Sequence, residues 1–176
     1  MVLAAVAVIA MVAAIGGLSL VRFYDDQLVR QTEDELLAQG AVISEVFALQ
    51  LAQRLDDETS YGLPAQVQRP RAADPTLTPL VPMLRASDPV LPAPPVSPPA
   101  TRAADPMAKE AALSMSGLLE EVSKTTLAGL RLVDVNGVVL ASSQEGNIGH
   151  SVESRVEFQR ALTGEAVSLL RERPKE

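Results

Sequence analysis

The sequence predicts an α+β protein in which a long N-terminal helix is followed by a small antiparallel sheet module. Residues 2–21 contain no charged side chain, and apolar residues continue at helical spacing from Arg22 to about Glu58. Between Leu130 and Ser142 the pattern changes to two short β-type runs. We therefore divide the chain into an anchor, a stalk, a proline-rich linker and a module, at residues 1–21, 22–60, 61–106 and 107–176.

Composition narrows the range of functions. The chain has no cysteine and a single histidine, so the sequence predicts neither a disulfide framework nor a metal site. A net charge of -7 without a Lys/Arg cluster disfavours a nucleic-acid partner, and the scarcity of aromatic residues removes base-stacking platforms. No cofactor is expected. The chain shows no nucleophile paired with a base and no glycine-rich phosphate loop, so we expect no enzyme activity from it.

The anchor is predicted to be a transmembrane helix, because residues 2–21 can cross roughly 30 Å of hydrocarbon. A cleaved signal peptide is the alternative, but the apolar run is longer than the usual hydrophobic core of such a peptide and no basic segment precedes it. Asp25 and Asp26 follow Arg22, and no Lys/Arg cluster is present there. This flank favours an extracytoplasmic position for the rest of the chain.

The stalk is predicted to continue straight out of the membrane as one helix. Its apolar positions have mostly helical spacing and comprise Leu28, Leu36, Ile43, Val46, Phe47 and Leu51, with Thr32 in the same series. So long a helix needs a partner for its apolar stripe. The candidates are the module, the helix after the linker, or a second copy in a parallel dimer. One stripe can face the module while an adjacent stripe faces the second copy.

The linker, residues 61–106, contains LPAPPVSPPA and three Asp-Pro steps. Proline removes a backbone donor and restricts the residue before it, so we expect neither helix nor sheet here. A disordered or polyproline II spacer is predicted. A ligand for a proline-recognition domain is the less favoured alternative.

The module is predicted to begin with a helix over residues 107–128, with Asp105 as its N-cap, Pro106 at its first position and Gly129 as its stop. A hairpin follows, with strands 130–135 and 138–142. Asn136 and Gly137 are the pair best able to adopt positive φ in a tight turn, and Asp134 can accept hydrogen bonds from the turn amides.

After a glycine-containing loop, Ser154 and Glu157 form a predicted capping box that opens a helix over residues 155–163, which Gly164 ends. Residues 167–170 are predicted to form a third strand. Two helices and three short strands make a poor closed core, so we expect the module to be truncated at its C-terminal end.

The order of these motifs resembles that of Cache or PAS-like extracytoplasmic sensor domains. The likeness is carried by the D-x-N-G hairpin, a loop ending I-G-x-S (residues 148–151), and the short helix R-x-E-F-x-x-A-L-x-G (residues 155–164). In addition, LVRQTEDELLAQG at residues 28–40 resembles the membrane-proximal helix of bacterial sensor histidine kinases. The proline-rich linker departs from the compact pattern of the family.

The resemblance implies a five-stranded antiparallel sheet that binds a small molecule on one face. It also implies a second transmembrane helix and a cytoplasmic histidine kinase portion, neither of which is in this sequence, that acts on a response regulator. The chain would then lie in a bacterial inner membrane as a parallel homodimer, with everything after the anchor in the periplasm. A diguanylate cyclase or a chemoreceptor output is an alternative within the same class.

Four residues are candidates for ligand binding. Arg155 falls where related Cache sensors place an arginine that can meet a ligand carboxylate, and Arg131, Phe158 and His150 are the other candidates. The alternatives are a solvated first-turn position for Arg155, core packing for Phe158 and loop packing or exposure for His150. Arg131 and Arg171 could face either a pocket or solvent.

A non-sensory envelope protein is the alternative from another class. A TonB-like energy transducer also joins one membrane helix to a proline-rich spacer and a small α/β domain. Its spacer would repeat Glu-Pro and Lys-Pro, and this linker does not. A sensory input region is therefore the favoured interpretation.

Overall fold

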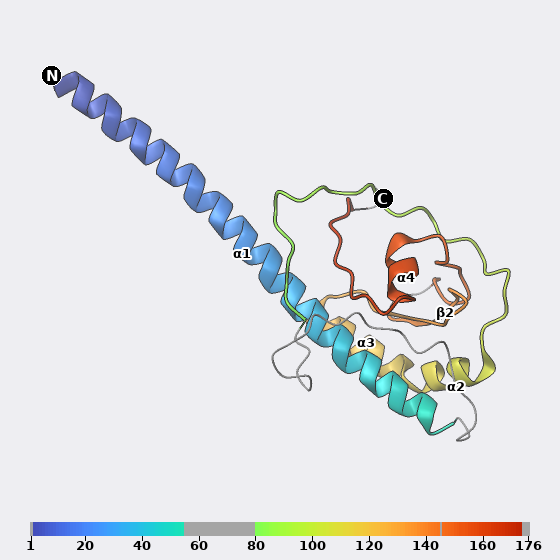
Figure 1. Ribbon diagram of the computed structural model, residues 1–176. Helices are drawn as coiled ribbons and strands as arrows, with labels where there is room; N and C mark the ends of the chain where they lie inside the picture. The colour runs from blue at the N-terminus through green and yellow to red at the C-terminus, as the bar shows by residue number, and fades with distance from the viewer. Residues whose placement is uncertain (1, 55–79, 145, 174–176) are drawn as a thin grey trace.

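A computed structural model describes residues 2–54, 80–144 and 146–173, which adopt an α+β arrangement (Figure 1). The first part of the long helix projects away from a compact module, and its last part lies along that module. The elements in chain order are α1 (Val2–Ala52), α2 (Pro106–Ser114), α3 (Ser116–Thr126), β1 (Arg131–Val133), β2 (Val139–Ser142) and α4 (Val156–Ala161).

Helix α1 runs without interruption through the predicted anchor and most of the predicted stalk, so these form one continuous helix as expected. It ends at Ala52, and residues 55–60 of the predicted stalk lie outside the described residues. In the described part of the chain, α1 is the one helix long and apolar enough to cross a membrane, judged by length and composition alone.

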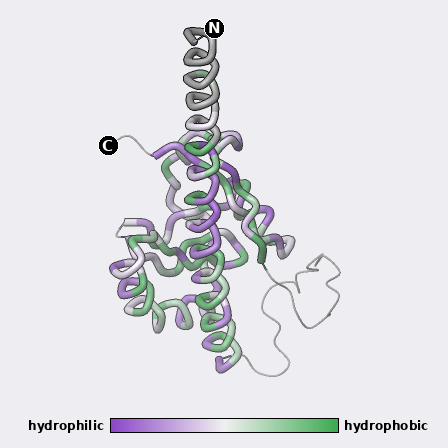
Figure 2. Tube along the Cα trace, turned by 90° about the vertical axis from the view of Figure 1, so that its left-hand side faces the viewer, coloured by the Kyte–Doolittle hydropathy of each residue, from purple (hydrophilic) through white to green (hydrophobic). Residues whose placement is uncertain are grey.

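The hydrophobic core forms where the last part of α1 meets the module (Figure 2). Helix α2 contacts both α1 and β2, and so separates the long helix from the sheet. The buried members of this core are Ile43, Leu51, Ala108, Ala111, Ala112, Met115, Leu119, Leu132, Leu140 and Ala141. The C-terminal part of the apolar stripe of the stalk is thus covered by the module, whereas Leu28 and Leu36 are 48% and 49% exposed.

The predicted helix over residues 107–128 is two helices. Its beginning is as expected, because Asp105 caps α2 by accepting a hydrogen bond from the Ala108 amide at 2.9 Å and Pro106 opens the helix. The break falls at Met115, immediately before Ser116 and Gly117, which are weak helix formers. The stop is Leu127 in the left-handed region (φ 58°), two residues before the predicted Gly129.

The hairpin is confirmed, with β1 and β2 antiparallel, Arg131 opposite Ser142, and an irregularity between Leu132 and Val133. Its turn differs from the expectation, because only Gly137 of the Asn136-Gly137 pair has a positive φ (78°). The Gly137 amide donates to the Asp134 carbonyl at 3.0 Å, which is the turn of a three-residue hairpin loop with a glycine bulge.

The C-terminal part differs more from the expectation. No capping box forms: the N-cap of α4 is Arg155 and not Ser154, and it makes no side-chain capping bond. The helix covers Val156–Ala161, three residues short of Gly164. Residues 167–170 form no strand, and the chain after them pairs in parallel with Leu91 through an isolated bridge at Arg171. The described sheet therefore has two strands.

We call residues 80–104 the strap, because this part of the predicted linker wraps over the module from α1 to α2 (Figure 1). The strap has no helix or strand of its own, as its prolines predict. It is nevertheless not the free spacer that we expected. It forms backbone bridges to Arg171 and His150 at the edge of the module. The amides of its non-proline residues donate to the module, and its carbonyls, including that of Pro98, accept. Residues 61–79 of the predicted linker lie outside the described residues.

Candidate ligand pocket

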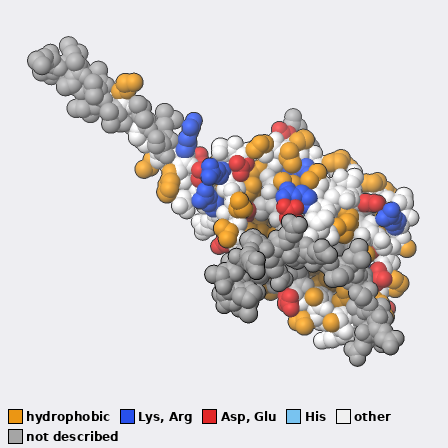
Figure 3. Space-filling view, in the orientation of Figure 1, with side chains coloured by type: hydrophobic (Ala, Val, Ile, Leu, Met, Phe, Trp, Pro, Cys, Tyr) orange, Lys and Arg blue, Asp and Glu red, His pale blue; other side chains and the backbone are white. Residues whose placement is uncertain are grey.

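A pocket of about 400 Å³ lies between β1, the turn that follows it and α4. Three of the four predicted site residues, Arg131, Arg155 and Phe158, line it together. The described residues that line it are Arg131, Val133, Asp134, Val135, Val152, Arg155, Glu157, Phe158, Ala161 and Leu162. Figure 3 shows basic and acidic side chains side by side on this face of the molecule, surrounded by hydrophobic ones. The volume is in the range of small-molecule sites.

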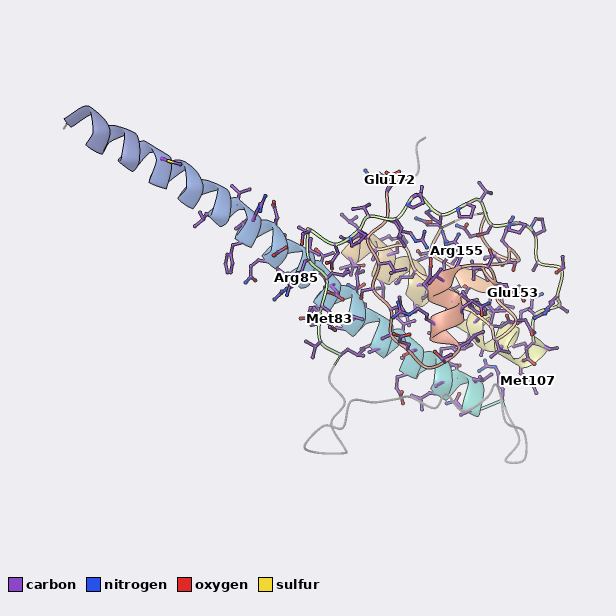
Figure 4. The ribbon with its side chains drawn as sticks, turned by 45° about the horizontal axis from the view of Figure 1, so that its top comes forward. Met83, Arg85, Met107, Glu153, Arg155 and Glu172 are labelled. Carbon is purple, nitrogen blue, oxygen red and sulfur yellow. The ribbon has the colours of Figure 1, made fainter. Side chains whose placement is uncertain are left out.

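Arg155 occupies the N-cap of α4, in extended backbone conformation (φ -80°, ψ 136°), at the centre of the module (Figure 4). Its Nη2 donates to the Ser97 Oγ of the strap at 2.8 Å. Burial, followed by the positive charge of Arg131, lowers the pKa of this guanidinium, while Glu157 opposes the shift. Among the described residues Arg155 forms no ion pair, so this partly buried cation has a neutral partner.

Glu157 is one of two acidic residues that line the pocket, and its partner is Arg171, near the C-terminal end of the described chain. Its Oε2 accepts from Arg171 Nη2 at 2.8 Å, and Arg171 Nη1 also donates to the Pro92 carbonyl at 3.2 Å. Burial acts to raise the pKa of Glu157, but the hydrogen bond from its own backbone amide and the charges of Arg171 and Arg155 outweigh it and lower the pKa. Glu157 is therefore a carboxylate at neutral pH.

The second acid of the lining, Asp134, has a structural task. It is 2% exposed. Its Oδ1 accepts from the amides of Asn136 and Val138, at 3.0 and 2.8 Å, and its Oδ2 accepts from the amide of Asp105 at 3.1 Å. The carboxylate thus closes the hairpin turn, as expected, and also fixes the start of α2.

The charges of the pocket favour an anion. Arg131 and Arg155 line it, the negative charge of Glu157 is paired with Arg171, and the oxygens of Asp134 are taken by backbone amides. A guanidinium can donate two parallel hydrogen bonds to a carboxylate. Phe158 and the aliphatic lining residues can cover the carbon part of such a molecule.

His150, the fourth predicted site residue, is not among the pocket residues. It pairs with Pro99 of the strap, and its carbonyl accepts from the Val139 amide at 2.9 Å. Its Nδ1 is buried and has no hydrogen-bond partner among the described residues. The structure therefore places His150 in the packing between the strap and the hairpin.

Sequence reasoning named neither Glu157 as a pocket residue nor a second hollow of about 520 Å³ beside α1. This hollow is mostly aliphatic, and Glu33 within it is 6% exposed and accepts from the Leu84 amide at 2.7 Å. Its lining is Leu28, Val29, Thr32, Glu33, Leu36, Leu37, Leu84, Val167, Ser168, Leu169 and Leu170. The spacing of Arg155 and Glu157, two residues apart, was the local pattern that could have identified Glu157 as a pocket residue. No local signal exists for the hollow, since its walls are far apart in sequence.

Metal binding is not supported in the described residues, where no three His, Cys, Asp or Glu side chains are grouped closely enough to hold an ion. Comparisons with protein-family models, with curated proteins and with solved structures gave no match to this chain. Function is therefore inferred from the geometry of the chain itself.

Proposed function

We propose that this chain is the extracytoplasmic ligand-sensing input region of a membrane-bound signal-transduction receptor, and that its ligand is a small organic carboxylate. The observation that supports this most is the pocket with two lining arginines, Arg131 and Arg155, in a module packed directly on a helix long enough to cross a membrane. The receptor class that the sequence resembles is a two-component sensor histidine kinase with a Cache or PAS-like domain.

The packing supports a route from the pocket to the membrane. The pocket lies beside β1, β1 pairs with β2, and α2 contacts both β2 and α1. A ligand that binds one arrangement of these layers more tightly shifts the population toward it. The proposed signal is a change in the position of α1, passed across the inner membrane to a kinase portion and its response regulator.

A second, exposed stripe on α1 supports the parallel homodimer. Val21, Leu28, Val42 and Leu49 are between 48% and 65% exposed and are separated by multiples of seven residues. A seven-residue repeat of apolar residues is the pattern by which helices pair in a left-handed supercoil. A Val42→Cys variant of this cysteine-free chain should cross-link to itself on mild oxidation, whereas Ser44→Cys, on another side of α1, should not. Equal cross-linking of the two variants would count against the stripe.

The carboxylate proposal is tested with the full chain in detergent. We expect at least one of acetate, lactate, malonate and citrate to raise its melting temperature relative to sodium chloride of equal ionic strength. Arg155→Ala should abolish this rise, because it removes the partly buried guanidinium of the pocket and leaves only Arg131, which is exposed to water. Arg160→Ala is the matched control, since Arg160 pairs with Glu165 and does not line the pocket. A rise that persists in Arg155→Ala rejects the role of that residue.

A further inference from the structure

The strap is attached to α1 by two acidic side chains. Asp26 Oδ1 accepts from the Ala86 amide at 2.9 Å, and Glu33 Oε2 accepts from the Leu84 amide at 2.7 Å. The two acids are seven residues apart and therefore lie on one side of the helix. Figure 4 shows Met83 and Arg85, which alternate with the bonded residues, beside α1.

A few residues later, the strap is attached to the rim of the pocket. Arg171 Nη1 donates to the Pro92 carbonyl at 3.2 Å, and Arg155 Nη2 donates to Ser97 Oγ at 2.8 Å. The Leu91 amide and carbonyl both pair with backbone groups of residues 170 and 172, each at 2.8 Å. One continuous segment thus joins Arg155 of the pocket, and Arg171 at its rim, to the long helix.

We propose that Ser97 is an internal competitor for Arg155, so that an anion in the pocket detaches the strap there and the change reaches α1 through Asp26 and Glu33. This rests on the proposed function, and it concerns how that pocket is regulated. The strap contact with Arg155 is the resting, autoinhibited state.

Charge decides the competition. The Ser97 hydroxyl is a neutral acceptor that takes one hydrogen bond from Arg155, whereas a carboxylate carries the opposite charge and can accept two parallel hydrogen bonds from one guanidinium. Arg155 is partly buried, and Arg131 and Arg171 add like charge near it. An arriving carboxylate relieves this repulsion, and a serine hydroxyl does not.

The composition of the strap suits it to transmit a displacement. Prolines at 89, 92, 94 and 95 lie between Ser97 and the residues bonded to α1, and they favour an extended, semi-rigid path, so a shift at Ser97 is not absorbed by coiling of that segment. The strap also reaches a different part of α1 from α2. Asp26 precedes the core residue Ile43 by a length of helix of roughly 25 Å, toward the N-terminal end.

The first test needs no ligand. Hydrogen exchange of the full chain is measured for wild type, Ser97→Ala, Ser97→Thr and the control Thr101→Ala, an exposed strap residue. We expect faster exchange at the amides of Leu84, Ala86 and Leu91 in Ser97→Ala, with protection restored in Ser97→Thr and unchanged in Thr101→Ala. Unchanged exchange at Leu84 and Ala86 in Ser97→Ala overturns the link to α1.

The second test measures malonate binding by calorimetry. Ser97→Ala should bind malonate roughly fivefold more tightly than wild type, because one competing hydrogen bond is gone. Weaker binding overturns the competition and makes Ser97 a residue that positions Arg155. If neither malonate nor acetate, lactate or citrate binds either protein, the competition falls together with the proposed ligand class, while the exchange experiment still decides whether the strap links the pocket rim to α1.

Discussion

The two faces of the module are held together by different forces. On the face toward α1, the core residues of α2 and α3 are almost completely removed from water: Ala108, Ala111, Ala112 and Leu119 are 0% exposed. On the pocket face, α4 has no buried residue and is joined to its neighbours through Arg155, Glu157 and Arg171. A face held by apolar burial resists separation, whereas polar contacts near water can exchange partners. The proposed ligand site lies on the face whose polar contacts can exchange partners.

The largest effect is expected on the buried face, from Leu119→Ala. This side chain is fully buried, so its truncation should lower the free energy of unfolding by about 2–5 kcal/mol. Leu118→Ala, at a neighbouring position that is 43% exposed, should cost less than about 1 kcal/mol. Urea unfolding followed by circular dichroism measures both. Similar losses for the two variants would mean that this face is not the tightly packed one.

Asp134→Ala should have the next largest effect, because Asp134 is where the two faces join. Removing its carboxylate leaves three backbone amides without their acceptor, at Asp105, Asn136 and Val138. We expect a loss of about 2–3 kcal/mol. Asp134→Asn keeps an acceptor oxygen and should lose less. The same urea experiment would contradict the bridging role of Asp134 if both variants unfolded like wild type.

The smallest effect is expected on the pocket face, from Glu157→Gln. The pKa of this carboxyl is lowered from 4.5 in the folded protein, so its contribution is present above the unfolded-state pKa and is lost as the pH falls through the folded-state value. The contribution should be below about 1 kcal/mol, since the pair with Arg171 is partly exposed to water.

Melting temperatures between pH 3 and pH 7 measure this effect, at intervals of about half a unit. The difference between wild type and Glu157→Gln should be constant near neutral pH and shrink on the acid side. The exposed Glu110→Gln is the control for a general charge effect. A difference that grows as the pH falls would show that the Glu157 carboxylate destabilises the pocket face.

The features that the sequence could predict are those whose interacting groups lie close together along the chain. The cap at Asp105 and the hairpin at Gly137 are confirmed, because each depends on residues within a few positions. The capping box failed although it is local: Ser154 lies outside the helix, and the chain enters α4 through Arg155, whose side chain is directed to Ser97.

Longer-range features could not be inferred from local patterns. The expected third strand is absent because its nearest partner is Leu91 of the strap, and prolines leave the strap few amides for a continuous ladder. Arg131, Arg155 and Phe158 line one pocket because of the way α4 lies over β1. The alternation of side chains along a strand does not predict that arrangement. The resemblance pointed to Arg155, but the partners of Arg155 and Glu157 emerge only in three dimensions.

The three alanines of α2 have a further mechanical consequence. Ala108, Ala111 and Ala112 present methyl groups in the core where α2 meets α1 and the sheet. Methyl groups have no rotamers to change, and they give a neighbouring helix little to interlock with. The proposed movement of α1 would therefore meet the least resistance from α2 along the helix axis, where the layers stay in contact, which is shear rather than hinge motion.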